Sequence, residues 1–263
     1  MTARQERPPA LVLVGAGIAA LFFLLPLAGL LLRAPWAEAP ADLTAPDSLL
    51  ALRLSVIASF SATALSVVFG VPLAWVLARF AFPGRNLLRA LVTLPMVLPP
   101  VVGGVALLLA FGRKGLLGPA LASIGVHLPF TTAGAVLAET LVAMPFLVIT
   151  VEAGLRALDT RYEEAARTLG AGRWYLFRRV TLPLLAPSLF AGAVLCWARA
   201  LGEFGATITF AGNFPGTTQT LPLAVYLELN GTRPEAAIML SLVLLAVSLA
   251  VLIGLRQRWL GAA

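Results

Sequence analysis

Long apolar runs separated by short polar segments dominate this sequence. A helix that crosses a bilayer needs about 20 mostly apolar residues, because each residue advances about 1.5 Å through a hydrocarbon core about 30 Å thick. Six runs meet this requirement and predict six membrane-spanning helices, at residues 10–32, 54–78, 90–112, 131–151, 184–202 and 236–255. Residues 206–210 and 221–227 are apolar but too short to span, and we expect re-entrant or gate segments there.

The first run has two interpretations. Arg4 and Arg7 precede it, and Ala37-Glu38-Ala39 follows it in the manner of a signal-peptide cleavage site. Its 23 apolar residues exceed the core of about 7–15 residues that is typical of a signal peptide. This length favours a retained helix over a cleaved signal.

Composition excludes an ordinary water-soluble enzyme. The chain is 60% hydrophobic and 12% charged, with a mean hydropathy of +0.94, whereas soluble domains carry about 25% charged residues. The sequence therefore predicts an all-α integral membrane protein.

The net charge of +7 is explained by membrane topology. If the N-terminus lies in the cytoplasm, the loops predicted on that side hold 13 of the 19 basic residues, five lie outside, and Arg199 falls within a span. The positive-inside rule then places both termini in the cytoplasm. Because these arginines flank spans, we expect lipid and not nucleic acid as their partner.

No pattern in the sequence predicts catalysis, a metal site or a bound cofactor. Cys196 and His127 are the single residues of their types. The one lysine, Lys114, does not lie in a G-x-x-x-x-G-K-[ST] loop, so no nucleotide site is predicted.

The longest predicted cytoplasmic loop, residues 152–183, contains a short helix. Thr160 and Glu163 have the spacing of a capping box, and Gly170 suits the left-handed residue that ends a helix. A helix of about nine residues is unstable alone in water, so something must hold it. It either docks on another protein through the smooth face around Ala165 and Ala166, or lies on lipid. These residues alone do not decide between docking on a protein and lying on lipid.

A resemblance favours docking. Glu164-Ala165-Ala166, then Gly170, then Val180-Thr181-Leu182-Pro183 resembles the E-A-A-x3-G-x9-I-x-L-P loop of ABC importer permeases, with valine in place of isoleucine. In that family the loop forms a coupling helix seated in a groove of a cytoplasmic ATPase. The resemblance implies ATPase coupling by Glu163, Glu164, Ala165, Ala166, Gly170, Leu182 and Pro183.

The resemblance extends over about two thirds of the chain, roughly residues 50–228, and is specific to the molybdate and sulfate group of these permeases. Its motifs are Phe82-Pro83-Gly84-Arg85, Leu94-Pro95-Met96-Val97-Leu98-Pro99-Pro100, Gly112-Arg113-Lys114-Gly115, Arg199-Ala200-Leu201-Gly202-Glu203-Phe204-Gly205 and Pro215-Gly216-Thr217-Thr218-Gln219-Thr220. Ala206-Thr207 and the last of these motifs favour molybdate over sulfate or thiosulfate, and tungstate remains an alternative.

The family implies a type I importer fold with six transmembrane helices and a cytoplasmic coupling helix. The whole chain, residues 1–263, would form one permease domain in the cytoplasmic (inner) membrane, with an extra N-terminal helix at 10–32, a core at about 50–255 and the coupling loop at 152–183. The implied partners are cytoplasmic ATPase subunits, a periplasmic or extracellular molybdate-binding protein and a second copy of the chain. No cofactor is implied. Two other classes of protein fit the sequence less well. An ion-coupled secondary transporter needs coupling carboxylates and repeated bundles. An intramembrane enzyme needs catalytic residues that the sequence does not offer.

Ionisable residues within or beside spans are the candidates for an anion path. Charge near the bilayer centre is costly, so such residues usually face a partner or a cavity. Arg199 and Glu203 are four residues apart and are expected to pair, either as a structural ion pair or as part of the path. Thr207 and Thr209 add hydroxyl groups, whereas Glu139 is expected to face another helix. Prolines and Gly103-Gly104 in the third run would allow a bend, consistent with a gate.

Residues 84–99 and 172–187 repeat each other, with eight identities in sixteen positions. The repeat suggests that the chain enters the membrane by the same backbone path twice.

Overall fold

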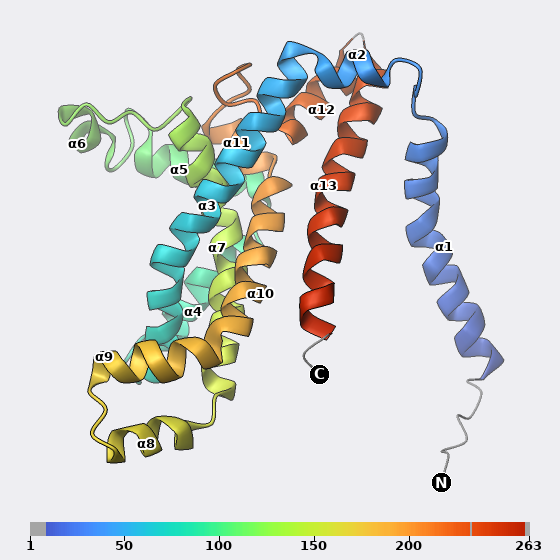
Figure 1. The fold of residues 1–263 in the computed structure, drawn as a ribbon. Helices are drawn as coiled ribbons and strands as arrows, with labels where there is room; N and C mark the ends of the chain where they lie inside the picture. Colours follow the sequence, from blue (N-terminus) through green and yellow to red (C-terminus); the bar gives the residue numbers. More distant parts are fainter. Residues whose placement is uncertain (1–8, 232, 261–263) are drawn as a thin grey trace. The chain divides into compact units, whose positions relative to one another are not determined.

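The computed structural model describes residues 9–231 and 233–260, and every regular element in these ranges is helical (Figure 1). Contacts divide the chain into two units, residues 46–224 and residues 1–45 with 225–263.

Three helices form the core of residues 46–224: α3 (Pro46–Arg79), α7 (Thr132–Ala157) and α10 (Leu182–Leu201). α3 buries small side chains about every fourth residue, among them Ala62, Ser66 and Ala74. Small residues let helix backbones approach closely within a membrane. A Cβ atom at Gly154 of α7 would lie 2.5 Å from the Cβ of Ser188 in α10, so these two helices are in close contact there.

The predicted third span is broken. α4 (Arg85–Thr93) and the 3₁₀ turn η1 (Leu94–Met96) are followed by α5 (Pro100–Phe111), and the two halves are bent by 117°. Proline lacks an N–H and disfavours helical geometry in the residue before it, so Pro99 and Pro100 stop the first half and start the second. The expected bend is confirmed, and residues 90–112 are therefore not one helix.

Short helices complete this unit. α8 (Thr160–Thr168) and α9 (Arg173–Leu176) lie at one end of the α3, α7 and α10 core, whereas α11 (Gly205–Phe210) lies toward the other (Figure 1). α9 continues through a π-helical turn, η2 (Phe177–Thr181), into α10. α6 (Gly118–Ser123) follows α5. α12 (Leu221–Asn230) begins beside α3, where the Leu221 N–H donates to Ser55 Oγ at 2.6 Å. α11 and α12 are too short to span, as expected.

The other unit contains α1 (Ala10–Leu32), α2 (Ala39–Thr44) and α13 (Pro234–Leu260). Met239 and Leu242 of α13 are buried together with Ala34, which follows α1. None of the α1 residues is buried.

Five helical segments among the described residues are long and apolar enough to cross a membrane: Ala10–Leu32, Pro46–Arg79, Thr132–Ala157, Arg173–Leu201 and Pro234–Val251. The bent pair Arg85–Met96 and Pro100–Phe111 makes a sixth if it counts as one span. The prediction of an all-helical, multi-span chain is confirmed.

The internal repeat does not produce a repeated backbone path. Gly84 has φ +87°, whereas Gly172 has φ −67° and ψ 161°. Pro95 lies in η1 just before the bend, whereas Pro183 lies in the first turn of the unbroken helix α10. The hypothesis of one path used twice is wrong.

Candidate functional site

α8 is terminated by a well-formed cap. Gly170 has φ +85°, its N–H donates to Arg167 O at 2.9 Å, and the Ala171 N–H donates to Ala166 O at 3.0 Å. This pair of bonds is the Schellman motif, which satisfies carbonyl groups left open at a helix end. The left-handed role predicted for Gly170 is confirmed.

The predicted capping box at the other end of α8 is wrong. The N-cap is Asp159, whose carboxylate accepts from the Arg161 N–H at 3.0 Å, and Thr160 is the first helical residue. Asp159 is as good a capping residue as threonine and stands one position earlier, which leaves Glu163 free for another contact.

Glu163 points into the protein and anchors α8. Its Oε1 accepts from Arg79 Nη2 at the end of α3 (2.9 Å) and from the Thr181 hydroxyl of η2 (3.0 Å). Trp75 of α3 packs edge-on against Phe177 of η2, with ring centroids 5.4 Å apart. A helix too short to persist alone is thus held by a buried carboxylate beside an aromatic contact.

The rest of α8 is largely open. Glu164, Ala165 and Gly170 are exposed and Ala166 is half-buried. Leu182 is half-buried and Pro183 exposed, both in the first turn of α10. Glu163, predicted to act with them, lies instead on the inner side of the helix, beside a cavity of about 940 Å³ that Arg79, Glu164 and Arg173 also line.

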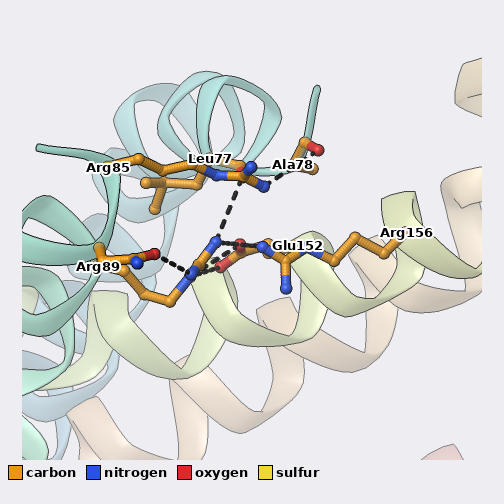
Figure 2. A network of polar contacts seen from close by, with 7 residues as sticks. Leu77, Ala78, Arg85, Arg89, Glu152 and Arg156 are labelled. Carbon is orange, nitrogen blue, oxygen red and sulfur yellow. Dashed lines mark hydrogen bonds and ion pairs between the residues drawn. The ribbon is translucent and has the colours of Figure 1, made fainter. Parts of the chain in front are cut away.

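A second charged cluster ties α4 to α7 at the same end of the core (Figure 2). The buried carboxylate of Glu152 in α7 accepts from Arg89 Nη2 of α4 at 2.7 Å and pairs with Arg156 Nη2 at 2.6 Å. Arg85 Nε donates to the carbonyl oxygen of Leu77, near the end of α3, at 2.8 Å.

At the other end, Arg199 and Glu203 pair as predicted, with Arg199 Nη2 2.6 Å from Glu203 Oε2. They do not share one helical face, because α10 ends at Leu201 and the contact closes over Gly202. Oε1 of the buried Glu203 accepts from the Ala206 N–H at 2.8 Å and so holds the first turn of α11.

The two threonines of α11 differ. Thr209 donates to Gly205 O at 2.7 Å, whereas the fully buried Thr207 hydroxyl finds no hydrogen-bond partner among the described residues. Glu139 of α7 is also buried, within electrostatic range of Glu203. The structure therefore groups Arg199, Glu203 and Thr207 with Glu139 near α11.

Sequence reasoning missed five residues of the charged end: Arg79, Thr181, Arg85, Arg89 and Glu152. Two signals pointed to them. Glu152 stands four residues before Arg156, and Arg85 closes the Phe82-Pro83-Gly84-Arg85 motif. Arg79 meets Glu163 across 84 positions and Arg89 meets Glu152 across 63 positions, and no local pattern predicts contacts of such separation.

Several apolar spans and a bent helix pair define a multi-pass membrane protein, in which a short exposed helix is anchored at one end of the core. The family described as binding-protein-dependent transport system inner membrane component matches residues 70–262. The chain belongs to this family.

Two relatives and one solved structure refine the picture. The molybdenum transport system permease protein ModB of Mycobacterium tuberculosis is 49% identical over 243 residues, covering 92% of this chain and 91% of that protein. The sulfate transport system permease protein CysT of Escherichia coli is 40% identical over 235 residues, covering 88% and 85%. The bacterial alginate ABC transporter, solved in complex with an alginate pentasaccharide-bound periplasmic protein, has a chain that aligns with a TM-score of 0.73 at 20% identity, covering 94% of this chain and 91% of that one. The fold is that of ABC importer permeases.

Proposed function

We propose that this chain is the permease subunit of an ATP-driven importer that carries molybdate across the cytoplasmic membrane. The observation that carries the proposal is the arrangement of α8. Its inner side is fixed to α3 and η2 through Glu163, while Glu164, Ala165 and Gly170 are exposed. A helix held on one side and open on the other can transmit the movement of a partner to the core.

The partner on this face is a separate ATPase. Glu164, Ala165, Ala166 and Gly170 make the contact, because small side chains allow close approach and the carboxylate supplies one charged point. Leu182 and Pro183 support it from the start of α10, and Glu163 contributes by anchoring α8. This chain hydrolyses no nucleotide itself in this scheme. In this scheme α8 lies in the cytoplasm, and the distribution of arginines favours both termini on the same side.

Two copies of the chain enclose the path, each as one permease domain, and a binding protein outside delivers the anion. Molybdate is a tetrahedral dianion, so the path should offer positive charge and hydroxyl groups without binding tightly. Arg199 and the half-buried hydroxyl of Thr209 supply these groups, with the buried Thr207 beside them on α11, and Glu203 orients Arg199.

The substrate follows from the relatives. The similarity to a molybdenum permease, at 49% identity, exceeds that to a sulfate permease, at 40%. Molybdate is therefore favoured over sulfate, and tungstate shares its charge and shape.

Proteoliposomes test the proposal. The chain is reconstituted with its co-expressed ATPase and binding protein, and uptake of labelled molybdate is followed with and without ATP. We expect uptake that requires ATP, that tungstate inhibits more strongly than sulfate, and that stops when the phosphate-loop lysine of the ATPase is replaced. Uptake by the permease without the ATPase would overturn the proposal in favour of a secondary transporter. Preferential sulfate uptake would overturn the assignment of molybdate as the substrate.

A further inference from the structure

The cluster around Glu152 joins three helices, α3, α4 and α7. Arg89 approaches Glu152 with two nitrogens, Nε at 3.1 Å and Nη2 at 2.7 Å from Oε1. The same guanidinium donates to Leu77 O of α3 at 3.5 Å, so it lies between the carboxylate and the end of α3, as Figure 2 shows. One side chain of α4 therefore contacts both α7 and α3.

The turn before α4 makes this contact possible. Gly84 has φ +87°, a conformation that glycine adopts without strain, and it turns the chain back on α3. Arg85 then donates to the carbonyl groups of Leu77 and Ala78, at 2.8 and 3.4 Å. Cations are favoured at this end of a helix, since the last carbonyl groups carry partial negative charge.

Glu152 is also well placed to sense α8. It lies less than two turns before the end of α7 at Ala157, and only Leu158 and Asp159 separate α7 from α8. A displacement of α8 therefore acts directly on the segment of α7 that carries Glu152.

From α4 the connection continues to α11. α4 passes through η1 into α5, and α5 touches α11 almost backbone to backbone. A Cβ atom at Gly104 would lie 2.6 Å from the Cβ of Thr209, and one at Gly205 would lie 3.1 Å from the Val101 nitrogen. Close-packed interfaces of this kind shift as a unit and deform little.

We infer that Glu152 is a positioning residue of the transport cycle: with Arg89 it fixes α4 to α7, so that movement of α8 reaches α5 and α11. The inference rests on the proposed function. A buried ion pair adds little net stability compared with apolar side chains of the same size. A guanidinium held by two nitrogens does fix orientation, and orientation is what a link between moving helices requires.

Glu152→Gln tests the inference, with Glu228→Gln, which also removes one carboxylate from an ion pair, as the matched control. In the reconstituted importer we expect Glu152→Gln to lower the molybdate transported per ATP hydrolysed by at least about fivefold, with ATPase binding unchanged. Glu228→Gln should keep the wild-type ratio. If the wild-type importer shows no ATP-dependent uptake, the proposed function fails; if it does and Glu152→Gln keeps the ratio, the inference alone fails.

A distance measurement separates positioning from stability. Cys196 is the single cysteine, so spin labels at Leu87 of α4 and Ala157 of α7, both exposed, can be introduced after Cys196→Ala. We expect the distance between the labels to stay fixed through the ATP cycle in the otherwise wild-type importer and to broaden when Glu152 is replaced. Arg89→Lys keeps the charge but loses the two-nitrogen contact, so it should broaden the distance too. It serves as the test if Glu152→Gln does not fold. A narrow distance in every variant that folds would overturn the inference.

Discussion

Arg79 Nη2 donates a hydrogen bond to Glu163 Oε1 at 2.9 Å and joins two residues 84 positions apart in the sequence. The same oxygen accepts from Thr181, so one buried carboxylate connects α3, α8 and η2. A nine-residue helix gains little from its own hydrogen bonds. The contact therefore explains why α8 persists, and it gives the route by which a movement of α8 would reach the core.

We expect Glu163→Gln to loosen α8. Glutamine can still accept one hydrogen bond, but Arg79 loses its counter-charge, which costs about 1.5–3 kcal/mol for a hydrogen bond to a charged group. Amide hydrogen exchange in residues 160–168 should accelerate, and uptake should fall with it.

Arg167→Gln is the control for this change. Arg167 also faces Glu163, but its nitrogen is 3.8 Å away and its side chain is 62% exposed. Such surface pairs contribute about 0–1 kcal/mol, so exchange in α8 should stay near the wild-type rate. Equal exchange in both variants would contradict the anchoring role of Glu163.

Gly170→Ala should weaken the end of α8 although there is room for the added methyl group. No heavy atom lies within 4 Å of a Cβ atom there, but φ is +85°, and a left-handed conformation costs roughly 1–2 kcal/mol for a residue with a side chain. We expect weaker ATPase binding in a pull-down from detergent and reduced uptake.

Gly172→Ala tests whether the backbone conformation causes this effect. Gly172 has the same open surroundings but φ −67°, which alanine adopts freely. ATPase binding should be unchanged in this variant. Comparable loss in both variants would mean that the chain there tolerates no side chain, and the argument from φ would fail.

The sequence was sufficient to predict α8 in the loop after α7, because the signals are local. Gly170 ends the helix through its own backbone, and Glu164-Ala165-Ala166 lies within one turn. The N-cap was misassigned because Asp159 and Thr160 are both capping residues, and the choice between them depends on Glu163 turning inward to Arg79.

Non-local contacts explain the other differences. The prolines predict a bend near residue 99 but not its angle, since the angle depends on how α5 meets α11. The pairing of Arg89 with Glu152 depends on the left-handed turn at Gly84, which brings α4 back beside α7. Arg199 and Glu203 pair as predicted, although across a helix end. α10 stops at Leu201, and Glu203 turns to accept from the Ala206 N–H of α11, a contact that no pattern in α10 predicts.

Gly104→Ala should disrupt the contact between α5 and α11. The added Cβ atom would lie 2.6 Å from the Cβ of Thr209 and 2.9 Å from Ala206 O, and neither atom belongs to the flexible end of a side chain. Overpacking of this kind costs about 1–3 kcal/mol. We expect a lower melting temperature of the purified subunit and little uptake.

Gly103→Ala is the matched control one residue earlier. Its nearest neighbour would be Leu141 Cδ2 at 3.5 Å, an ordinary contact. Uptake and melting temperature should remain close to wild type. If Gly103→Ala is as damaging as Gly104→Ala, the effect belongs to α5 itself and not to its contact with α11.

Arg199→Ala should impair both stability and uptake, and a second substitution separates the two effects. Removing Arg199 leaves the carboxylate of Glu203, 1% exposed, without its partner at 2.6 Å. The loss of one partner from a buried pair costs on the order of 3 kcal/mol. Adding Glu203→Gln removes the stranded charge, and glutamine can still accept from the Ala206 N–H, so the melting temperature should recover.

Uptake by the double variant decides the role of Arg199. If Arg199 serves the anion, molybdate uptake stays low in Arg199→Ala/Glu203→Gln although the fold is restored, because the positive charge is absent from the path. We expect this result, together with partial uptake in Arg199→Lys, which keeps the charge. Full uptake by the double variant would reduce Arg199 to a structural partner of Glu203, and the anion would then have to be guided by other groups of α11, such as the half-buried hydroxyl of Thr209.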